Sequence, residues 1–211
     1  KTYKTHVFGD ELFILDYDPI HGKSNLLRVQ KDGSIETQKP SNDAHNRDVI
    51  VFDDTIFVSH GRTDVPWPSM RWSHDDGATW KQIEQANVSK RSLYERFIVF
   101  DGTLYACTNS KEWGKGGRKR GMSLKDIKAA LVPKEGVPWL IKYTGDRAAP
   151  WAAVHMSPDG FLPRHPDGNS EYGEVIWLGE QAGDELVFTS ASRVYVATSI
   201  DPPRVTPVAL G

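Results

Sequence analysis

The six-residue frame Phe52-Asp53-Asp54-Thr55-Ile56-Phe57 predicts a β-hairpin, and the chain repeats this frame three more times. The other copies are residues 8–13 (FGDELF), 100–105 (FDGTLY) and 182–187 (AGDELV). Asp-Asp, Asp-Gly and Gly-Asp tolerate the positive backbone angles of a two-residue turn, while the flanking aromatic and branched residues suit a pleated strand. Each copy therefore predicts a strand, a tight turn and a second strand.

The spacing of these frames indicates the fold. They start at residues 8, 52, 100 and 182, so successive starts are 44, 48 and 82 residues apart. The first two intervals match the roughly 40 to 50 residues of one four-stranded propeller blade. We therefore predict an all-β chain with about four antiparallel blades, in a single β-propeller domain or a fragment of a larger ring.

The predicted blades cover approximately residues 1–44, 45–92, 93–168 and 169–211. An insertion over residues 111–138 explains the long third interval, and Ser123 is predicted to cap a short amphipathic helix inside it. A wholly missed fifth blade is the alternative explanation. Strand signals resume at residues 139–143, and we expect the Pro- and Gly-rich residues 150–168 to form a long loop.

A second hairpin signal follows in blade two, at Ser73-His74-Asp75-Asp76-Gly77-Ala78-Thr79-Trp80. It fits Ser-x-Asp-x-Gly-x-Thr-Trp at every defined position and is identified as an Asp box, the bacterial neuraminidase repeat. We expect Asp75 to accept backbone N–H groups across the turn, Gly77 to supply the unusual backbone angle, and Trp80 to pack between sheets. Weaker copies at residues 31–35 and 198–201 occur where the repeat predicts them.

The composition argues against several function classes. The 211 residues include 26 Lys and Arg against 28 Asp and Glu, so no overall positive field exists that would hold nucleic acid. No apolar run approaches the ~20 residues of a membrane span, so no membrane insertion is expected. Cys107 is the only cysteine, which excludes an internal disulfide. No His, Asp or Glu spacing predicts a metal site, and no cofactor is expected.

The sequence contains one glycosylation sequon, at Asn87-Val88-Ser89. Such a sequon suits a secreted protein, and the expected location is extracellular or at the cell surface. The chain starts at Lys1 without an apolar leader, so we expect a piece that was processed or cut from a longer parent. Further blades, from the parent chain or another subunit, would then complete the ring.

Polar residues stand where the first strand of each predicted blade begins. In a propeller the first strands line the central channel, so residues at their beginnings converge on one mouth of it. Here these residues are Tyr3-Lys4, His45-Asn46-Arg47-Asp48, Tyr94-Glu95-Arg96 and Glu171-Tyr172-Gly173-Glu174. The pattern predicts a cavity lined by Arg, Glu, Tyr and His.

The run from Arg47 to Trp80 resembles the opening blade of the sialidase (neuraminidase) family. In that family an Arg-Ile-Pro strand leads through a Gly-Thr-Leu hairpin to Glu-Gly-Arg, then to an aspartate in a loop and an Asp box preceded by arginine. The corresponding residues here are Arg47, Asp54-Thr55-Ile56, Gly61-Arg62, Asp64 and Arg71-Trp72-Ser73. Two departures are that Asp48-Val49 replaces Ile-Pro and His60 replaces the glutamate before Gly-Arg.

The resemblance implies a sialidase-like glycan-processing enzyme, a glycoside hydrolase that acts on an acidic sugar, and a six-bladed ring of which this chain would form a part. Arg47 would be one of three arginines that grip the sugar carboxylate, a task that suits the planar guanidinium. Asp64 would be the acid/base, and Tyr172 with Glu171 is the candidate for the family's nucleophilic tyrosine and its glutamate. The full predicted set for substrate binding is Arg47, Arg62, Arg96, Glu95, Tyr94, His45, His60 and Trp67.

Two other functions use the same residues. A polysaccharide lyase needs a Tyr or His base and an Arg or His that neutralises a uronate carboxylate, and His45, His60, Arg62 and Tyr94 would supply them. A non-catalytic propeller would bind a glycan or a protein partner instead. If the chain binds carbohydrate, we expect Trp67, Trp113 and Trp151 to be exposed and available to sugars, because they occur in irregular segments.

Overall fold

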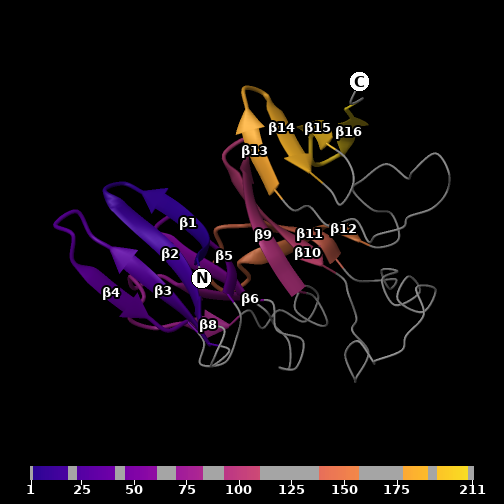
Figure 1. The fold of residues 1–211 in the computed structure, drawn as a ribbon. Helices are drawn as coiled ribbons and strands as arrows, with labels where there is room; N and C mark the ends of the chain where they lie inside the picture. The colour runs from indigo at the N-terminus through magenta and orange to yellow at the C-terminus, as the bar shows by residue number, and fades with distance from the viewer. Residues whose placement is uncertain are drawn as a thin grey trace, which may run out of the picture. The chain divides into compact units, whose positions relative to one another are not determined.

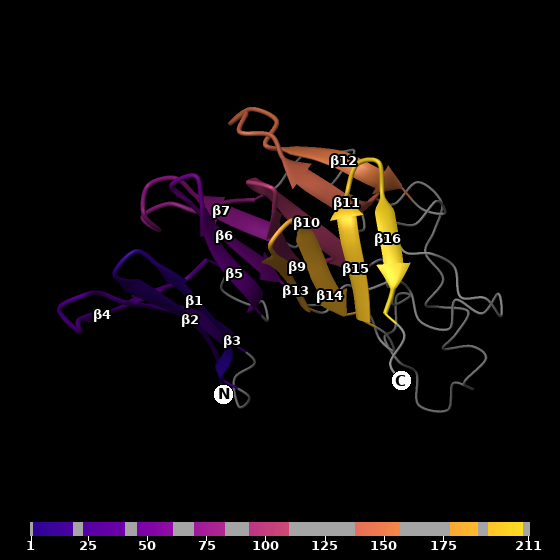
Figure 2. The same ribbon diagram turned by 90° about the horizontal axis from the view of Figure 1, so that it is seen from above.

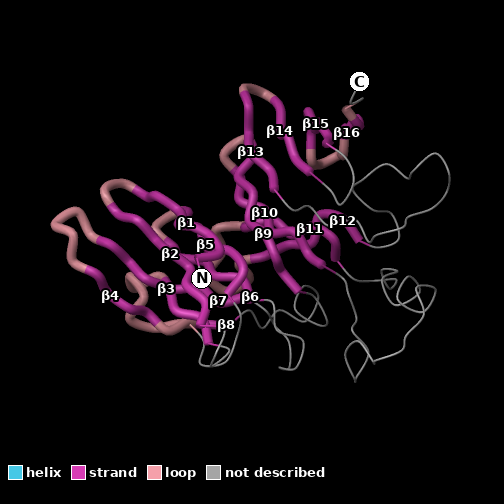
Figure 3. The backbone as a smooth tube through the Cα atoms, in the orientation of Figure 1, coloured by secondary structure: helices cyan, strands magenta, loops and turns pink. Residues whose placement is uncertain are grey.

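The fold is known from a computed structural model that describes residues 2–18, 23–40, 46–60, 70–82, 93–109, 138–156, 178–189 and 194–208. Every regular element in these ranges is a β-strand, drawn in magenta in Figure 3. The strands form four antiparallel sheets of four strands each. The helix predicted near Ser123, and the whole of the predicted insertion up to residue 137, lie outside the described residues.

In every sheet the strands follow one another in chain order (Figure 1). The first sheet consists of β1 (Thr2–Phe8), β2 (Glu11–Asp18), β3 (Lys23–Val29) and β4 (Ile35–Gln38). The second consists of β5 (Asn46–Phe52), β6 (Thr55–His60), β7 (Met70–Ser73) and β8 (Lys81–Gln82). The third consists of β9 (Leu93–Phe100), β10 (Thr103–Asn109), β11 (Pro138–Tyr143) and β12 (Trp151–Met156). The fourth consists of β13 (Leu178–Ala182), β14 (Glu185–Thr189), β15 (Val194–Ser199) and β16 (Arg204–Pro207), which lie side by side in Figure 2.

Four consecutive four-stranded meanders are the blades of a β-propeller, so the predicted fold class is confirmed. The four hairpin frames are the turns that join the first and second strands of each sheet. Asp53 and Asp54 adopt φ of 49° and 50°, and Asp101 and Gly102 adopt 48° and 66°. Aspartate and glycine suit these turns because they tolerate left-handed backbone conformations better than most other residues do.

One expectation about the third sheet is wrong. Residues 151–156, which were expected to begin a long loop, form strand β12 and pair with β11. Trp151, expected to be exposed, is only 1% exposed and its ring lies 5.7 Å from that of Tyr143. Burial of a large aromatic side chain is more favourable than its exposure in a loop. Pro150 precedes the strand and does not interrupt it.

The chain divides into two compact units, which are described separately. Unit one consists of Lys1–Glu84 and Leu93–Phe97, and unit two of Gln85–Ser92 and Ile98–Gly211. The core of unit one lies between the first and second sheets, and Trp80 packs against it. The members of this core alternate along their strands, so they share one face of each sheet, and Phe57 on the opposite face of β6 is buried as well. They are Phe13, Leu15, Leu26, Val49, Val51, Ile56 and Val58.

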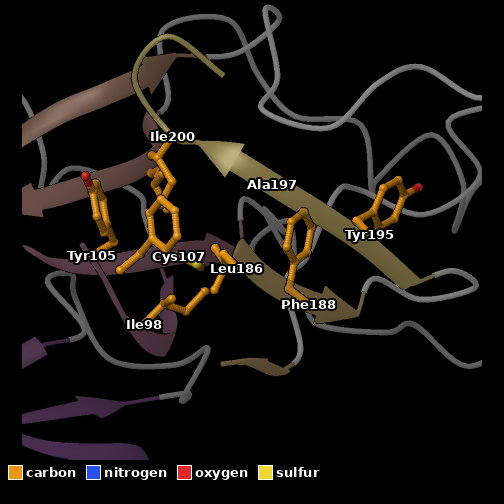
Figure 4. Packing of buried hydrophobic residues seen from close by; sticks show 10 residues of the cluster. Ile98, Tyr105, Cys107, Leu186, Phe188, Tyr195, Ala197 and Ile200 are labelled. Carbon is orange, nitrogen blue, oxygen red and sulfur yellow. The ribbon is translucent and has the colours of Figure 1, made fainter. Parts of the chain in front are cut away.

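The core of unit two lies between the third and fourth sheets (Figure 4). Phe188 and Tyr195 stack with their ring centroids 5.3 Å apart and their planes 13° from parallel. The other buried members are Ile98, Phe100, Tyr105, Cys107, Leu140, Leu186, Ala197 and Ile200. The lone cysteine is thus part of an apolar core.

The turn between β7 and β8 is closed by side-chain hydrogen bonds. The hydroxyl of Ser73 donates to Asp75 Oδ1 at 2.7 Å and accepts the N–H of Gly77 at 2.8 Å. Asp75 Oδ1 also accepts the N–H of Thr79 at 2.9 Å, and Oδ2 accepts the Thr79 hydroxyl. These donors favour the charged carboxylate, and the hydrogen bond from the Thr79 hydroxyl has the largest effect. Together they lower the pKa of Asp75 to about 2.

The same turn fastens the second sheet to the first. Gln38 Nε2 donates to the carbonyl oxygen of Asp76 at 3.0 Å, and Arg28 Nη1 lies 2.7 Å from Asp76 Oδ2. Arg28 also forms a two-pronged ion pair with Glu11, at 2.7 and 2.9 Å. Gly77, at φ +88°, lies so close to Gln38 that an added Cβ would be 2.3 Å from Gln38 Nε2. Only glycine satisfies both the backbone angle and the close approach.

Candidate functional site at the beginning of the inner strands

Charged residues meet where β1, β5 and β9 begin, all within unit one. Lys4 Nζ on β1 lies 3.1 Å from Asp48 Oδ1 on β5. Arg96 Nη1 on β9 donates to the carbonyl oxygen of Arg47 on β5 at 2.9 Å. We call Lys4, Arg47, Asp48 and Arg96 the strand-start cluster. The first strands of three blades therefore bring their charged residues together, as propeller geometry requires.

Asp48 holds this cluster together. Its carboxylate is 1% exposed, and Oδ1 accepts the N–H of Val49 at 3.0 Å in addition to the contact with Lys4. Oδ2 accepts the N–H of Phe97 at 2.9 Å. One carboxylate thus contacts residues from three strands, so Asp48 positions its neighbours. Both of its oxygens are thus engaged within the protein.

Arg47 occupies a β-bulge. Asn46 pairs with His60 and Asp48 pairs with Ser59, so Arg47 is the extra residue between them. The first sheet has the same irregularity between Thr2 and Lys4. A bulge redirects the side chain of the extra residue relative to a regular strand, and bulges are common beside binding sites. The backbone at Arg47 therefore departs from the alternation of a regular strand, and the direction of its side chain departs with it.

The strand-start cluster contains three cationic side chains and one carboxylate. Asp48 is occupied by Lys4 and by backbone N–H groups, so it leaves the two guanidinium groups without a carboxylate partner in the described part of the chain. The Nε atoms of Arg47 and Arg96 are both buried and have no hydrogen-bond partner among the described residues. Two partly buried guanidinium groups with free donors suit a carboxylate ligand.

His6 lies next to the cluster on β1. Burial lowers the pKa of its imidazole below the usual 6.5, the charge of Lys4 lowers it further, and Asp48 opposes both effects. The ring is therefore mostly neutral at pH 7, and its Nε2 atom is buried without a partner in the described ranges. A neutral imidazole in this place adds no charge to the cluster.

The structure brings two of the predicted site residues together, Arg47 and Arg96. Tyr94 and Glu95 belong to β9, and His60 is the last residue of β6, but their side chains are not among those described. The remaining predicted residues lie outside the described ranges. These are His45, Arg62, Asp64, Trp67, Glu171 and Tyr172.

Three residues of this region were assigned no role in binding or catalysis from the sequence: His6, which was not singled out, and Lys4 and Asp48, which were named only among the polar residues at the strand beginnings. The frame spacing contained a signal for two of them. Lys4 and Asp48 are 44 residues apart, and Arg96 follows 48 residues later, which are the same intervals that separate the first three hairpin frames. Equivalent positions in successive first strands lie next to each other, so the spacing itself pairs these charges.

Among the described residues, no group of three or more His, Cys, Asp and Glu is arranged to hold a metal ion. The same ranges contain no helix that is long and apolar enough to cross a bilayer. The strand-start cluster itself offers charged side chains and hydrogen-bond donors.

The chain matches no protein-family model and no curated protein sequence. It is similar to solved structures at low identity. The GH43_1 enzyme from Xanthomonas citri, complexed with xylotriose, is 15% identical with a TM-score of 0.48, over 98% of this chain and 72% of that one. A GH43 β-xylosidase/α-arabinofuranosidase from a compost microbial metagenome is 12% identical with a TM-score of 0.47, over 98% and 77%. A puromycin hydrolase is 11% identical with a TM-score of 0.50, over 98% and 32%. At these identities the likeness concerns the fold alone.

Proposed function

We propose that this chain is a sialidase-like, glycan-processing propeller that binds an acidic sugar at the strand-start cluster. The observation that carries the proposal is the pairing of Arg47 and Arg96, whose contact at 2.9 Å joins the first strands of two blades. The resemblance of residues 47–80 to the opening blade of the sialidases supports it from the sequence. The two guanidinium groups would hold the sugar carboxylate.

The chemistry of the cluster favours an anion over a neutral ligand. The described cations outnumber the carboxylates three to one, and Asp48 is already engaged by Lys4 and two backbone N–H groups. A carboxylate that enters this place meets guanidinium donors in a partly desolvated setting, where charge-assisted hydrogen bonds are strongest. Arg62, one loop away in the sequence, is the proposed third arginine.

The proposed reaction is hydrolysis of a glycosidic bond, with residues assigned by the resemblance. Asp64 is the proposed acid/base and Tyr172, with Glu171, the proposed nucleophile. Asp48 takes no part in proton transfer, because its two oxygens hold the strands. Its role is to fix Arg96 and Arg47 in place before the ligand arrives.

The test separates binding from turnover. Binding of a sialic-acid-terminated oligosaccharide is measured by titration calorimetry, and turnover is assayed on a panel of sialosides and other acidic glycans. Arg47→Ala and Arg96→Gln should each weaken binding at least about tenfold, since each removes one charged hydrogen-bonding partner. Gln keeps a donor for the Arg47 carbonyl oxygen. Arg204→Ala, on the exposed strand β16, is the matched control and should bind like the wild type.

Asp64→Ala and Tyr172→Phe should abolish turnover while the acidic oligosaccharide still binds. If the wild type binds the acidic glycan saturably but does not hydrolyse it, the chain is a recognition propeller and not an enzyme. Equal affinity of the wild type, Arg47→Ala and Arg96→Gln for every acidic glycan tested would remove the binding proposal altogether.

A further inference from the structure

A cavity lies within unit two, and none of its lining residues belongs to the strand-start cluster. It has a volume of about 360 Å³. It opens between the β9–β10 turn, the β13–β14 turn and the turn that follows β15. Ligand pockets in proteins typically have volumes of roughly 300 to 1,000 Å³, so this one is large enough for a small ligand.

The walls of the cavity are fixed by hydrogen bonds. The N–H of Asp101 in the first turn donates to Gln181 Oε1 at 3.0 Å, and Gln181 Nε2 donates to the carbonyl oxygen of Gly183 at 2.8 Å. Gln181 thus joins the β9–β10 turn to the β13–β14 turn. A cavity whose walls are already ordered costs a ligand little conformational entropy on binding.

The floor of the cavity is part of the core of unit two. Tyr105 and Ile200 are 8% and 3% exposed, and they lie together at one end of the buried cluster in Figure 4. The floor is thus buried, whereas the polar residues Asp101, Gln181, Asp184 and Asp201 of the lining are exposed to solvent.

The lining combines acceptors and hydroxyl groups. Three carboxylates, from Asp101, Asp184 and Asp201, and three hydroxyls, from Thr103, Thr198 and Ser199, face it. No lysine or arginine is among its described lining residues, and Lys142 approaches Asp201 only at 4.0 Å. The charged groups of the lining are therefore all carboxylates, whereas cations predominate in the strand-start cluster.

The pKa of Tyr105 responds to these carboxylates. Burial raises the pKa of its phenol, and the charges of Asp201 and Asp101 raise it further, while a hydrogen bond with Thr103 opposes them. The phenol is therefore protonated at neutral pH. An anionic ligand is excluded from this cavity by the same carboxylates.

We propose that the cavity binds a neutral, polyhydroxylated ligand, such as one residue of an uncharged sugar chain. A sugar hydroxyl both donates and accepts, so it can pair with the carboxylates and with the Thr and Ser hydroxyls at once. The Thr and Ser hydroxyls can donate to neighbouring carboxylates and accept from a ligand, so a ligand that itself both donates and accepts can use every polar group of the lining. The proposal is independent of the function proposed for the strand-start cluster.

The test follows backbone amide signals of the whole chain by NMR while a ligand is added. Cellobiose is the neutral probe, glucuronate the acidic probe and ethylenediamine the cationic probe. Cellobiose should shift the amides of Asp101, Gly183 and Ser199 in a saturable way. Glucuronate should leave these amides unchanged.

Two variants and two matched controls complete the test. Asp101→Asn and Asp184→Asn should each weaken cellobiose binding about five- to tenfold, because a neutral acceptor replaces a charged one. Asp53→Asn and Asp10→Asn occupy the same positions of the hairpin frames in unit one and should bind cellobiose like the wild type. Asparagine tolerates the positive φ of Asp101 and Asp53, so the fold is kept.

Three results would overturn the proposal. The first is that cellobiose shifts none of these amides. The second is that Asp101→Asn and Asp184→Asn bind cellobiose as tightly as the controls. The third is that ethylenediamine saturates the same amides at lower concentration than cellobiose, which would make the cavity a site for cations.

Discussion

The carboxylate of Asp48 accepts the backbone N–H of Phe97 at 2.9 Å, so a side chain of β5 satisfies a main-chain group of β9. These residues belong to first strands that are not hydrogen-bonded neighbours in one sheet. A buried N–H without an acceptor costs free energy, and here the acceptor comes from the preceding blade. The same carboxylate contacts Lys4, so three blades depend on one residue.

Asp48→Asn should lower the free energy of unfolding by about 1 to 3 kcal/mol, because at least one buried donor then loses its acceptor. Urea denaturation at pH 7 measures the loss. Lys4→Met is the paired variant and should cost less than about 1 kcal/mol, since the lysine side chain is 34% exposed and its ion pair is screened by water. Equal losses in the two variants would mean that the ion pair, and not the bond to Phe97, makes Asp48 important.

Gly77→Ala should destabilise unit one by about 1 to 3 kcal/mol through backbone strain at φ +88°, with roughly 1 kcal/mol more for the displaced Gln38 side chain. Gly33→Ala is the matched control, because it has φ +81° and open space around the added Cβ. Thermal and urea unfolding of both variants should show a larger loss for Gly77. If the two losses are the same, the contact between the turn and Gln38 contributes nothing.

Asp75 should make stability depend on pH in the acid range. Its folded-state pKa of about 2 lies below the ordinary value of 3.8, so the stabilisation it gives is complete above pH 3.8 and disappears as the pH falls toward 2. Unfolding midpoints of wild type and Asp75→Asn, compared between pH 2 and pH 6, should converge at the acid end and diverge above pH 4. Parallel curves throughout this range would contradict the assignment.

His6 should act in a different pH window. Its pKa is lowered in the folded state, so the unfolded chain binds a proton more readily and folding is less favourable below the ordinary pKa of 6.5. Stability should therefore increase as the pH rises through the folded pKa toward 6.5, and His6→Gln should reduce this dependence. The difference between the urea midpoints of the two proteins, compared from pH 5 to 8, measures the contribution of the imidazole.

The hairpin frames could be predicted because their chemistry is local. Aspartate and glycine pairs between branched residues select the turn, and the recurrence every 44 to 48 residues indicates one blade per frame. The turn at Ser73–Trp80 was also predicted in detail, since Asp75 accepts the N–H of Thr79 and Gly77 adopts positive φ. Each of these contacts spans only a few residues of sequence.

Contacts between distant segments could not be predicted as well. Trp151 was assigned to a loop because Pro150 and the glycines that follow suggested one, although pairing with β11 determines its burial. The prediction of Arg47 and Arg96 as neighbours used the fold, but the role of Asp48 depends on a bond to Phe97, 49 residues away. Composition and spacing do not specify which lone pair accepts which N–H.

The boundary between the two compact units falls inside β9, between Phe97 and Ile98. A truncated protein that stops after the second sheet, at residue 84, would lack Arg96 and the main-chain donor of Phe97 that Asp48 requires. The shortest fragment that contains all of unit one must therefore include Leu93–Phe97, the first five residues of β9. A fragment that ends at residue 84 should therefore unfold at a lower urea concentration than one that ends beyond residue 97 and keeps the Phe97 N–H for Asp48.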